Sequence, residues 1–168
     1  MKFPFTLDKL EEIHRHAVAE YPYECCGIVA GKTAGIEDDV LFRCTNIQNK
    51  LHGMDPKTYP RDARTAFYID PRELMGILKE TEKKGLAIKT FYHSHPEHDA
   101  YFSEEDKRMA LFDDEPVYPG TNYVVVSVYN KEVKRTALFA WNPDKKVFEE
   151  QQTARIDTNT FKQDGRFV

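Results

Sequence analysis

The sequence predicts a mixed α/β domain with a central mixed β-sheet flanked by helices. Segments with helical periodicity alternate with short β-branched or aromatic runs, and the last of these runs are joined only by turn residues. This alternation is typical of a sheet covered by helices. A chain of 168 residues fits a single domain. We expect that domain to span residues 1–150 and a polar tail to follow at residues 151–168.

The first helix is expected between Thr6, which can cap it, and Pro22, which ends it. Apolar residues recur between them at helical spacing, so one side of this helix should pack against the sheet. His14 and His16 lie two positions apart on it, which places them about 200° apart around the axis. They cannot bind one metal ion together, and we expect both to lie on the surface.

Several segments have the β-branched and aromatic content of strands. They are residues 23–31, 40–46, 65–69, 86–92, 123–129, 133–141 and 147–148. The run at 123–129 is almost continuously apolar, which indicates a central strand. The polar, turn-rich stretch at 48–64 predicts a mobile surface loop, and His52 within it has no recognisable partner.

Two more helices are expected between strands. Asp70, Pro71 and Glu73 have the spacing of a helix start, with the aspartate as cap, proline at the first position and the glutamate bonding back to the cap. That helix should end near residue 85. The sequence Ser103-Glu-Glu-Asp106 has the same kind of spacing and predicts a helix that continues until Pro116.

Composition excludes several classes of function. The net charge is -4 and basic residues are interleaved with acids, so the chain lacks the basic stripe that nucleic acid attracts. It has no apolar run of about 18 residues and no signal-peptide core at its N-terminus, so we expect a cytoplasmic protein that does not bind membranes. Three cysteines without a CxxC pair argue against a disulfide framework and against a thiolate zinc site.

The stretch from His93 to Asp106 resembles half of a metal site. His93 and His95 lie two positions apart at the end of a predicted strand, so their side chains point to the same face and can bind one ion. The helix start at Ser103 then returns a carboxylate, that of Asp106, to a defined place. Two imidazoles and a carboxylate suit a catalytic zinc ion, which keeps one position open for water.

A hydrolytic zinc site also needs a carboxylate that carries a proton to the leaving amine. Glu24 opens an apolar strand, where an acid lies either at an exposed end or beside a cleft with a raised pKa. Ser103 can donate a hydrogen bond to a developing oxyanion, although Ser103 and Asp106 are also explained as a helix cap alone. His98, in the loop between, is a spare ligand, a substrate contact or an exposed loop histidine.

Together these residues resemble the JAMM (MPN+) zinc metalloproteases. The pattern is His93-x-His95, seven residues, Ser103, two residues and Asp106, with Glu24 upstream in a Glu-Cys-Cys-Gly setting. The resemblance implies a fold similar to that of the cytidine deaminases. The sequence resembles the deaminases themselves less, because it lacks their Pro-Cys-x-x-Cys element. The resemblance to the metalloproteases also implies that His93, His95 and Asp106 are zinc ligands. Glu24 is then the general acid/base, and Ser103 is the oxyanion donor.

Members of this family hydrolyse peptide or isopeptide bonds after the C-terminal glycine of ubiquitin or ubiquitin-like proteins. The chain has little sequence between Asp106 and Tyr123, so it resembles the compact prokaryotic branch. That branch is associated with small sulfur-carrier proteins ending in Gly-Gly, from which its members release an attached or C-terminal amino acid. Phe102 departs from the pattern, because many relatives have proline before the serine.

The resemblance therefore leads to the hypothesis of a zinc peptidase that trims a ubiquitin-like sulfur carrier. The alternative is a catalytically inactive MPN-type scaffold that binds protein partners, which the presence of all five motif residues disfavours. A third hypothesis, a cysteine hydrolase that uses Cys25 or Cys26, predicts inhibition by thiol alkylation and resistance to chelators.

Overall fold

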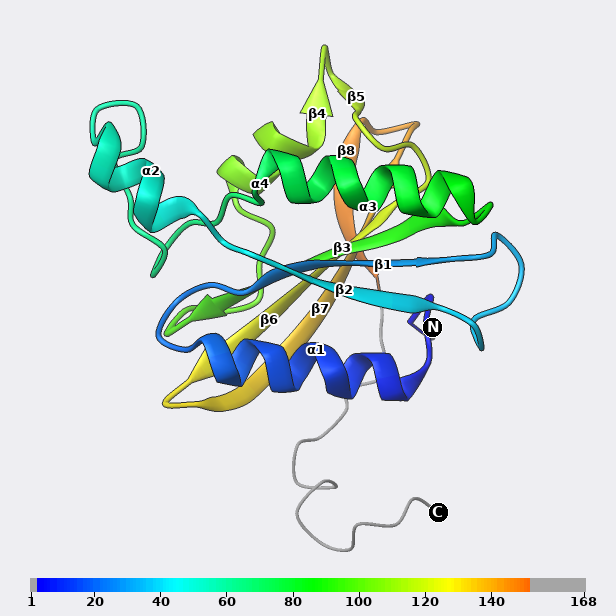
Figure 1. The fold of residues 1–168 in the computed structure, drawn as a ribbon, viewed down its shortest axis with the longest axis horizontal. Coiled ribbons are helices and arrows are strands. Elements are labelled where there is room, and N and C mark those ends of the chain that lie inside the picture. Colours follow the sequence, from blue (N-terminus) through cyan, green and yellow to red (C-terminus); the bar gives the residue numbers. More distant parts are fainter. Residues whose placement is uncertain (1–2, 152–168) are drawn as a thin grey trace, which may run out of the picture.

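A six-stranded mixed β-sheet forms the middle layer of the molecule, with helices on both of its faces (Figure 1). The computed structural model describes residues 3–151. The strand order is β2-β1-β3-β6-β7-β8. These strands are β1 (Cys26–Gly31), β2 (Val40–Cys44), β3 (Ala87–Pro96), β6 (Asn122–Tyr129), β7 (Glu132–Asn142) and β8 (Val147–Gln151). The predicted mixed α/β class is confirmed.

Helix α1 covers one face of this sheet, and α3 and α4 lie on the other (Figure 1). The helices of the described chain are α1 (Leu7–Glu20), α2 (Gln48–Met54), α3 (Pro71–Lys83) and α4 (Glu104–Ala110). α1 packs Leu10, Ile13 and Ala17 against a core that contains buried valines of β6. The predicted first helix is therefore confirmed in position, but the side chain of Thr6 makes no capping hydrogen bond.

The two histidines of α1 do not lie freely on the surface. His16 is 4% exposed, and its Nδ1 lies 2.8 Å from the hydroxyl of Tyr92. His14 is half-buried, with Nε2 2.8 Å from Oγ1 of Thr136. Burial lowers the pKa of both imidazoles to about 4. The surface prediction is wrong because His16 lies one turn after the buried Ile13, on the packed side of the helix.

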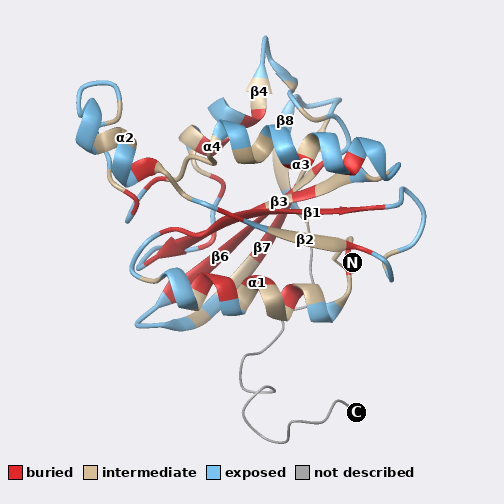
Figure 2. Cartoon of the chain, viewed as in Figure 1, coloured by how far each residue is buried: buried red, intermediate tan, exposed pale blue. Residues whose placement is uncertain are grey.

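The middle of the sheet is its most buried part (Figure 2). β3 pairs antiparallel with β1 and parallel with β6, and residues 124–128 of β6 are all buried, which confirms the predicted central strand. In the pairing with β1, His93 lies opposite Cys26. The residues just before β1 therefore lie beside the end of β3, and this register sets up the site described below.

α3 starts at the predicted cap. The side chain of Asp70 accepts a hydrogen bond from the backbone N–H of Arg72 at 2.8 Å. Glu73 does not bond back to the cap as predicted. Its Oε2 accepts a hydrogen bond from the backbone N–H of Thr45 at 2.7 Å, so it joins α3 to the end of β2.

The stretch at 48–64 is not simply a loop, because it begins with α2. The chain after α2 is tied back to this helix. Nδ1 of His52 lies 2.7 Å from the carbonyl oxygen of Tyr59, and the amide of Gln48 donates to the carbonyl of Arg61, also at 2.7 Å. His52 therefore has a partner that its sequence position did not indicate.

Residues 65–69 do not form a sheet strand, which corrects the prediction. Only Ile69 makes an isolated antiparallel bridge, with Asn46. The side chain of Asn46 bonds the backbone of this stretch as well, through the carbonyl of Ala66 and the N–H of Tyr68. A side-chain amide thus provides hydrogen bonds that a neighbouring strand would otherwise provide.

α4 is shorter than predicted, since it ends at Ala110. The chain then forms a two-stranded hairpin, β4 (Leu111–Phe112) and β5 (Glu115–Pro116). Asp113 and Asp114 make its turn with φ values of 51° and 58°, a conformation that aspartate tolerates in two-residue hairpin turns. Of the predicted tail, Gln151 belongs to β8 and residues 152–168 lie outside the described chain. Within residues 3–151, no helix is long and apolar enough to span a membrane.

Candidate metal centre

The three side chains predicted to bind a metal come from two elements at one end of the sheet. His93 and His95 lie near the end of β3 and point to the same face, and Asp106 lies in the first turn of α4. All three are buried, and one ligand atom from each lies within 4.8 Å of the others. The structure therefore brings these three residues together.

The distances between their ligand atoms suit one small cation. Nε2 of His93 lies 3.1 Å from Nε2 of His95 and 3.4 Å from Oδ1 of Asp106. Nε2 of His95 lies 3.9 Å from Oδ2 of Asp106. Ligand atoms held about 2.0–2.1 Å from a tetrahedral zinc ion are about 3.3 Å apart, so this donor set fits zinc. It also leaves the fourth position to be filled by water or substrate.

Asp106 is both a helix-capping residue and a member of this cluster. Its Oδ2 accepts hydrogen bonds from the backbone N–H of Ser103 at 2.8 Å and from the Ser103 hydroxyl at 2.6 Å. Ser103 Oγ in turn accepts a hydrogen bond from the Asp106 N–H at 3.1 Å, which completes a capping box. The cap and the cluster are thus compatible, because the cap uses Oδ2 and Oδ1 faces His93.

The charges within the cluster place Asp106 and His95, but not His93, in metal-binding protonation states. Burial opposes a charged His93, yet the carboxylate of Asp106 raises the pKa of this imidazole. Burial likewise opposes ionisation of Asp106, but His93 and the hydrogen bonds from Ser103 hold its pKa well below the usual range. Burial and the neighbouring His93 lower the pKa of His95 to about 4. At neutral pH the carboxylate is therefore ionised and His95 is neutral, the forms that bind metals.

The loop after β3 fixes the ring of His95. Nδ1 of His95 lies 2.8 Å from the carbonyl oxygen of Asp99, which leaves Nε2 to face the cluster. Arg135 of β7 holds this loop by donating to the carbonyl of Ala100 at 2.8 Å and to the Asp99 carboxylate at 3.4 Å. Exposed His98 lies in the same loop, with Nδ1 2.9 Å from the carbonyl oxygen of Pro96.

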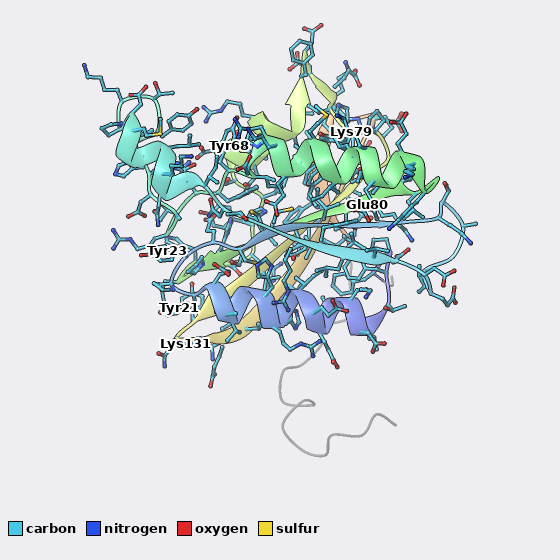
Figure 3. All side chains as sticks on the ribbon, viewed as in Figure 1. Tyr21, Tyr23, Tyr68, Lys79, Glu80 and Lys131 are labelled. Carbon is cyan, nitrogen blue, oxygen red and sulfur yellow. The ribbon has the colours of Figure 1, made fainter. Side chains whose placement is uncertain are left out.

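Glu97 ties the same loop to the rest of the fold. Its Oε1 accepts hydrogen bonds from the hydroxyl of Tyr21 at 2.6 Å and from the backbone N–H of Asn130 at 2.8 Å. Figure 3 shows Tyr21 and Lys131 at the same end of the molecule, where α1 ends and β6 turns into β7. The loop beside the metal cluster is therefore anchored from two sides.

Aromatic side chains line the cluster. Phe67 stacks on His93 with ring centroids 4.7 Å apart, and Tyr101 lies against His95 at 4.9 Å. Phe102, the departure from the family pattern, is buried and packs against Tyr123 and Phe139. It anchors the start of α4 through apolar contacts, and the serine that follows it still caps the helix.

Glu24 lies just before β1 and beside the cluster, as the strand register requires. Its side chain is 5% exposed, and its backbone N–H donates to the carbonyl of Ala63 at 2.7 Å. Burial raises the pKa of Glu24 to about 8, against the opposing charges of His93 and Arg61. Glu24 is therefore a buried acid beside a cleft and not an acid at an exposed strand end.

Two cavities meet at the metal cluster. The first has a volume of 230 Å³ and is lined by Glu24, His95, Ser103 and Asp106, which are four of the five site residues named from the sequence. His98 also lines it. The second has a volume of 400 Å³ and is mainly apolar. It reaches the cluster at His93 and Asp106, and its other lining residues include Phe67, Leu74, Phe91, Met109 and Tyr118.

Sequence reasoning missed an ion pair at the mouth of the first cavity. Arg61, from the loop after α2, pairs with Glu105, which directly precedes Asp106 on α4. Both residues line the cavity. No local pattern could have identified them, because the contact joins a loop to a helix far along the chain.

The two adjacent cysteines are poor candidates for a nucleophile. Cys25 and Cys26 are buried and belong to core clusters on opposite faces of the sheet. Burial raises the pKa of Cys25 to about 12 and that of Cys26 further. Both are thiols at neutral pH, and only the thiolate is a strong nucleophile.

Residues 7–153 match the family of prokaryotic homologs of the JAB domain. The chain belongs to this family. It is 28% identical over 118 residues to a protein of Haloferax volcanii named desampylase, an alignment that covers 70% of this chain and 72% of the relative. It is 32% identical over 101 residues to a probable TtuB-protein conjugate cleaving protease of Thermus thermophilus, covering 60% of this chain and 58% of that protein.

Solved structures agree with the family assignment. A protein of Desulfitobacterium hafniense with a solution structure gives a TM-score of 0.62 at 25% identity, over 88% of both chains. A solution structure of a Salinibacter ruber protein gives a TM-score of 0.57 at 29% identity, over 94% of this chain and 92% of that one. The fold is thus shared along nearly the whole length of these proteins.

Proposed function

We propose that this protein is a zinc-dependent peptidase that hydrolyses the bond after the C-terminal glycine of a ubiquitin-like protein. The observation that carries the proposal is the convergence of His93, His95 and Asp106 beside the cavity that His95 and Asp106 line together with the buried Glu24. Relatives named for desampylation and for cleavage of TtuB-protein conjugates support this class of substrate. We assign the activity to the domain at residues 1–150.

In this proposal each residue of the cleft has one task. His93, His95 and Asp106 would hold zinc, which would supply a Lewis acid for the scissile carbonyl and for the activation of water. Glu24 accepts a proton from the attacking water and delivers it to the leaving nitrogen. Burial raises the pKa of Glu24 from its usual acidic value, which favours a group that both takes up and releases a proton. Ser103 provides a hydrogen-bond donor for the oxyanion.

A tail that ends in Gly-Gly suits the entrance to this site. Aromatic rings flank the two ligand imidazoles, with Phe67 on His93 and Tyr101 on His95, so a tail without side chains can reach the carbonyl position most easily. We therefore propose a small sulfur carrier of the ubiquitin-like class as the substrate. A non-catalytic scaffold is less well supported, because binding a partner requires no buried proton carrier beside converging ligands.

The proposal is tested with purified protein that is first stripped of metal and then reloaded with one equivalent of zinc. Cleavage of a carrier fused through Gly-Gly to a second protein should need zinc and should stop when a chelator is added. Thiol alkylation should leave the rate unchanged, since Cys25 and Cys26 are buried. An intact fusion after incubation with fully zinc-loaded protein would contradict the proposal.

A further inference from the structure

A cationic side chain lies at the mouth of the metal cleft and has no role in the proposed chemistry. Arg61 pairs with Glu105, and its Nη1 donates to the carbonyl of Thr65 at 3.2 Å. The Arg61 side chain is 47% exposed, so a bound molecule can reach it. Exposed ion pairs contribute at most about 1 kcal/mol to stability, so holding the fold together is a weak reason for this pair.

The position of Arg61 is fixed from both sides of the cleft. On one side, Ala63 accepts the backbone hydrogen bond of Glu24, and Gln48 holds the carbonyl of Arg61 itself. On the other side, the guanidinium pairs with Glu105, the residue before Asp106 in α4. Arg61 therefore lines the same cavity as Glu24 and Asp106, and its positive charge acts on Glu24.

In the proposed reaction the leaving group lies beside Glu24, in the cavity that Arg61 also lines. The leaving nitrogen has to approach Glu24 to receive its proton. When the released group is a single amino acid, its α-carboxylate carbon is about 2.5 Å from that nitrogen. When the released group is a lysine side chain, a four-carbon stem separates the nitrogen from the lysine backbone. Of these two leaving groups, only the amino acid has a carboxylate this close to its nitrogen.

A guanidinium can bind such a carboxylate without losing all of its present contacts. It has five N–H donors in a planar fork that matches the two oxygens of a carboxylate. The Glu105 carboxylate then keeps the guanidinium in place before substrate binds. The substrate carboxylate binds the guanidinium either together with Glu105 or in its place.

We propose that Arg61 determines specificity on the leaving side of the scissile bond by binding the free α-carboxylate of one amino acid attached after Gly-Gly. The inference rests on the proposed function and narrows it. The enzyme should prefer a one-residue extension with a free carboxylate to the same extension as an amide, and to a lysine isopeptide.

The test compares three probes built on TtuB of Thermus thermophilus, the protein named in the description of one relative. Each probe is TtuB made to end in Gly-Gly, followed by one alanine as the free acid, by one alanine as the primary amide, or by an isopeptide bond to the side chain of N-acetyl-lysine amide. With the zinc-loaded full chain, kcat/KM should be about tenfold higher for the free acid, mainly through a lower KM, as one charge-assisted contact predicts.

Two substitutions of the same ion pair separate recognition from structural support. Arg61→Met should reduce kcat/KM for the free acid to the level of the amide, and Arg61→Lys should keep part of the preference. Glu105→Gln breaks the same pair from its other end but leaves the guanidinium, so it should keep the preference. Calorimetry on the zinc-loaded Glu24→Gln variant measures binding without cleavage, and the Kd for the amide probe should be about tenfold higher than the Kd for the acid probe. Adding Arg61→Met to this variant should make the two Kd values equal.

The outcomes distinguish this inference from the proposed function. Cleavage of all three probes at equal rates by the wild-type protein would overturn the role of Arg61 and leave the peptidase activity standing. Equal losses on every probe in Arg61→Met and Glu105→Gln would show that the pair only supports the loop, which also overturns the inference. A zinc-loaded wild-type protein that cleaves none of the probes would contradict the proposed function, and the inference with it.

Discussion

Replacing Glu24 with glutamine should abolish turnover and stabilise the metal-free fold. Glutamine is neutral and close in size, but it cannot accept the proton of the attacking water. Loss of a general acid/base costs about 10²- to 10⁴-fold in rate. Zinc content should stay at the wild-type level, because the converging ligand atoms belong to His93, His95 and Asp106.

The gain in stability follows from the position of Glu24 in the fold. The side chain is 5% exposed, and burial raises its pKa from 4.5 to about 8. The contribution of Glu24 to the free energy of unfolding is thus fully present below pH 4.5, where the carboxyl is neutral in both states. It is lost as the pH rises through about 8, because the unfolded chain ionises this group more readily than the fold does. One pH unit corresponds to about 1.4 kcal/mol, so the loss amounts to about 3 kcal/mol at pH 7 and about 5 kcal/mol above pH 8. Glutamine does not titrate and avoids this loss.

Urea unfolding of the metal-stripped wild-type protein and of Glu24→Gln at pH 5, 7 and 9 measures this effect. The free-energy advantage of the variant should be under about 1 kcal/mol at pH 5 and should grow towards pH 9. Glu82→Gln, at an exposed position of α3, is the matched control and should show no such growth. An advantage that is the same at pH 5 and pH 9, or a variant that retains turnover within tenfold, would refute the reasoning.

Two further substitutions test how the site is held. Ser103→Ala removes both the cap and the oxyanion donor, so it should cost about 1 kcal/mol in urea unfolding and about 10²- to 10³-fold in kcat; a loss of stability alone would mean that the serine only caps α4. Arg135→Met releases the loop whose Asp99 carbonyl holds His95, so zinc affinity in a competition assay with a chromophoric chelator should fall about 10- to 100-fold. Lys134→Met, at the neighbouring and 49% exposed position of β7, should leave zinc affinity unchanged, and equal losses in both variants would contradict the loop argument.

The sequence predicted most of the candidate site because its members depend on local geometry. His93 and His95 share a face through the two-residue period of a strand, and Ser103 and Asp106 are placed by the first turn of a helix. Glu24 is the exception. Its partnership with the cluster depends on the antiparallel register of β1 and β3, and the sequence indicated it only through an acid at the start of an apolar strand.

The errors occur where a side chain bonds a distant backbone or packs on a distant side chain. Asn46 takes the place of a strand partner for residues 65–69, and Glu73 bonds Thr45 where a local cap was expected. His16 is buried because Tyr92 of β3 supplies a polar partner in the core. Local periodicity and capping rules contain no information about such contacts, so they predict elements well and the bonds between elements poorly.

The helix cap and the metal cluster share the short sequence at 103–106 because Asp106 belongs to both. One oxygen, Oδ2, takes the N–H and O–H of Ser103, and the other, Oδ1, faces His93 at 3.4 Å. The hydrogen bonds of the cap therefore hold the carboxylate in a single orientation as soon as α4 forms. A ligand that is already ordered loses little side-chain entropy when it binds, which strengthens metal binding without any additional contact. The folding of α4 thus orients the carboxylate of Asp106, the residue that we propose as the third metal ligand.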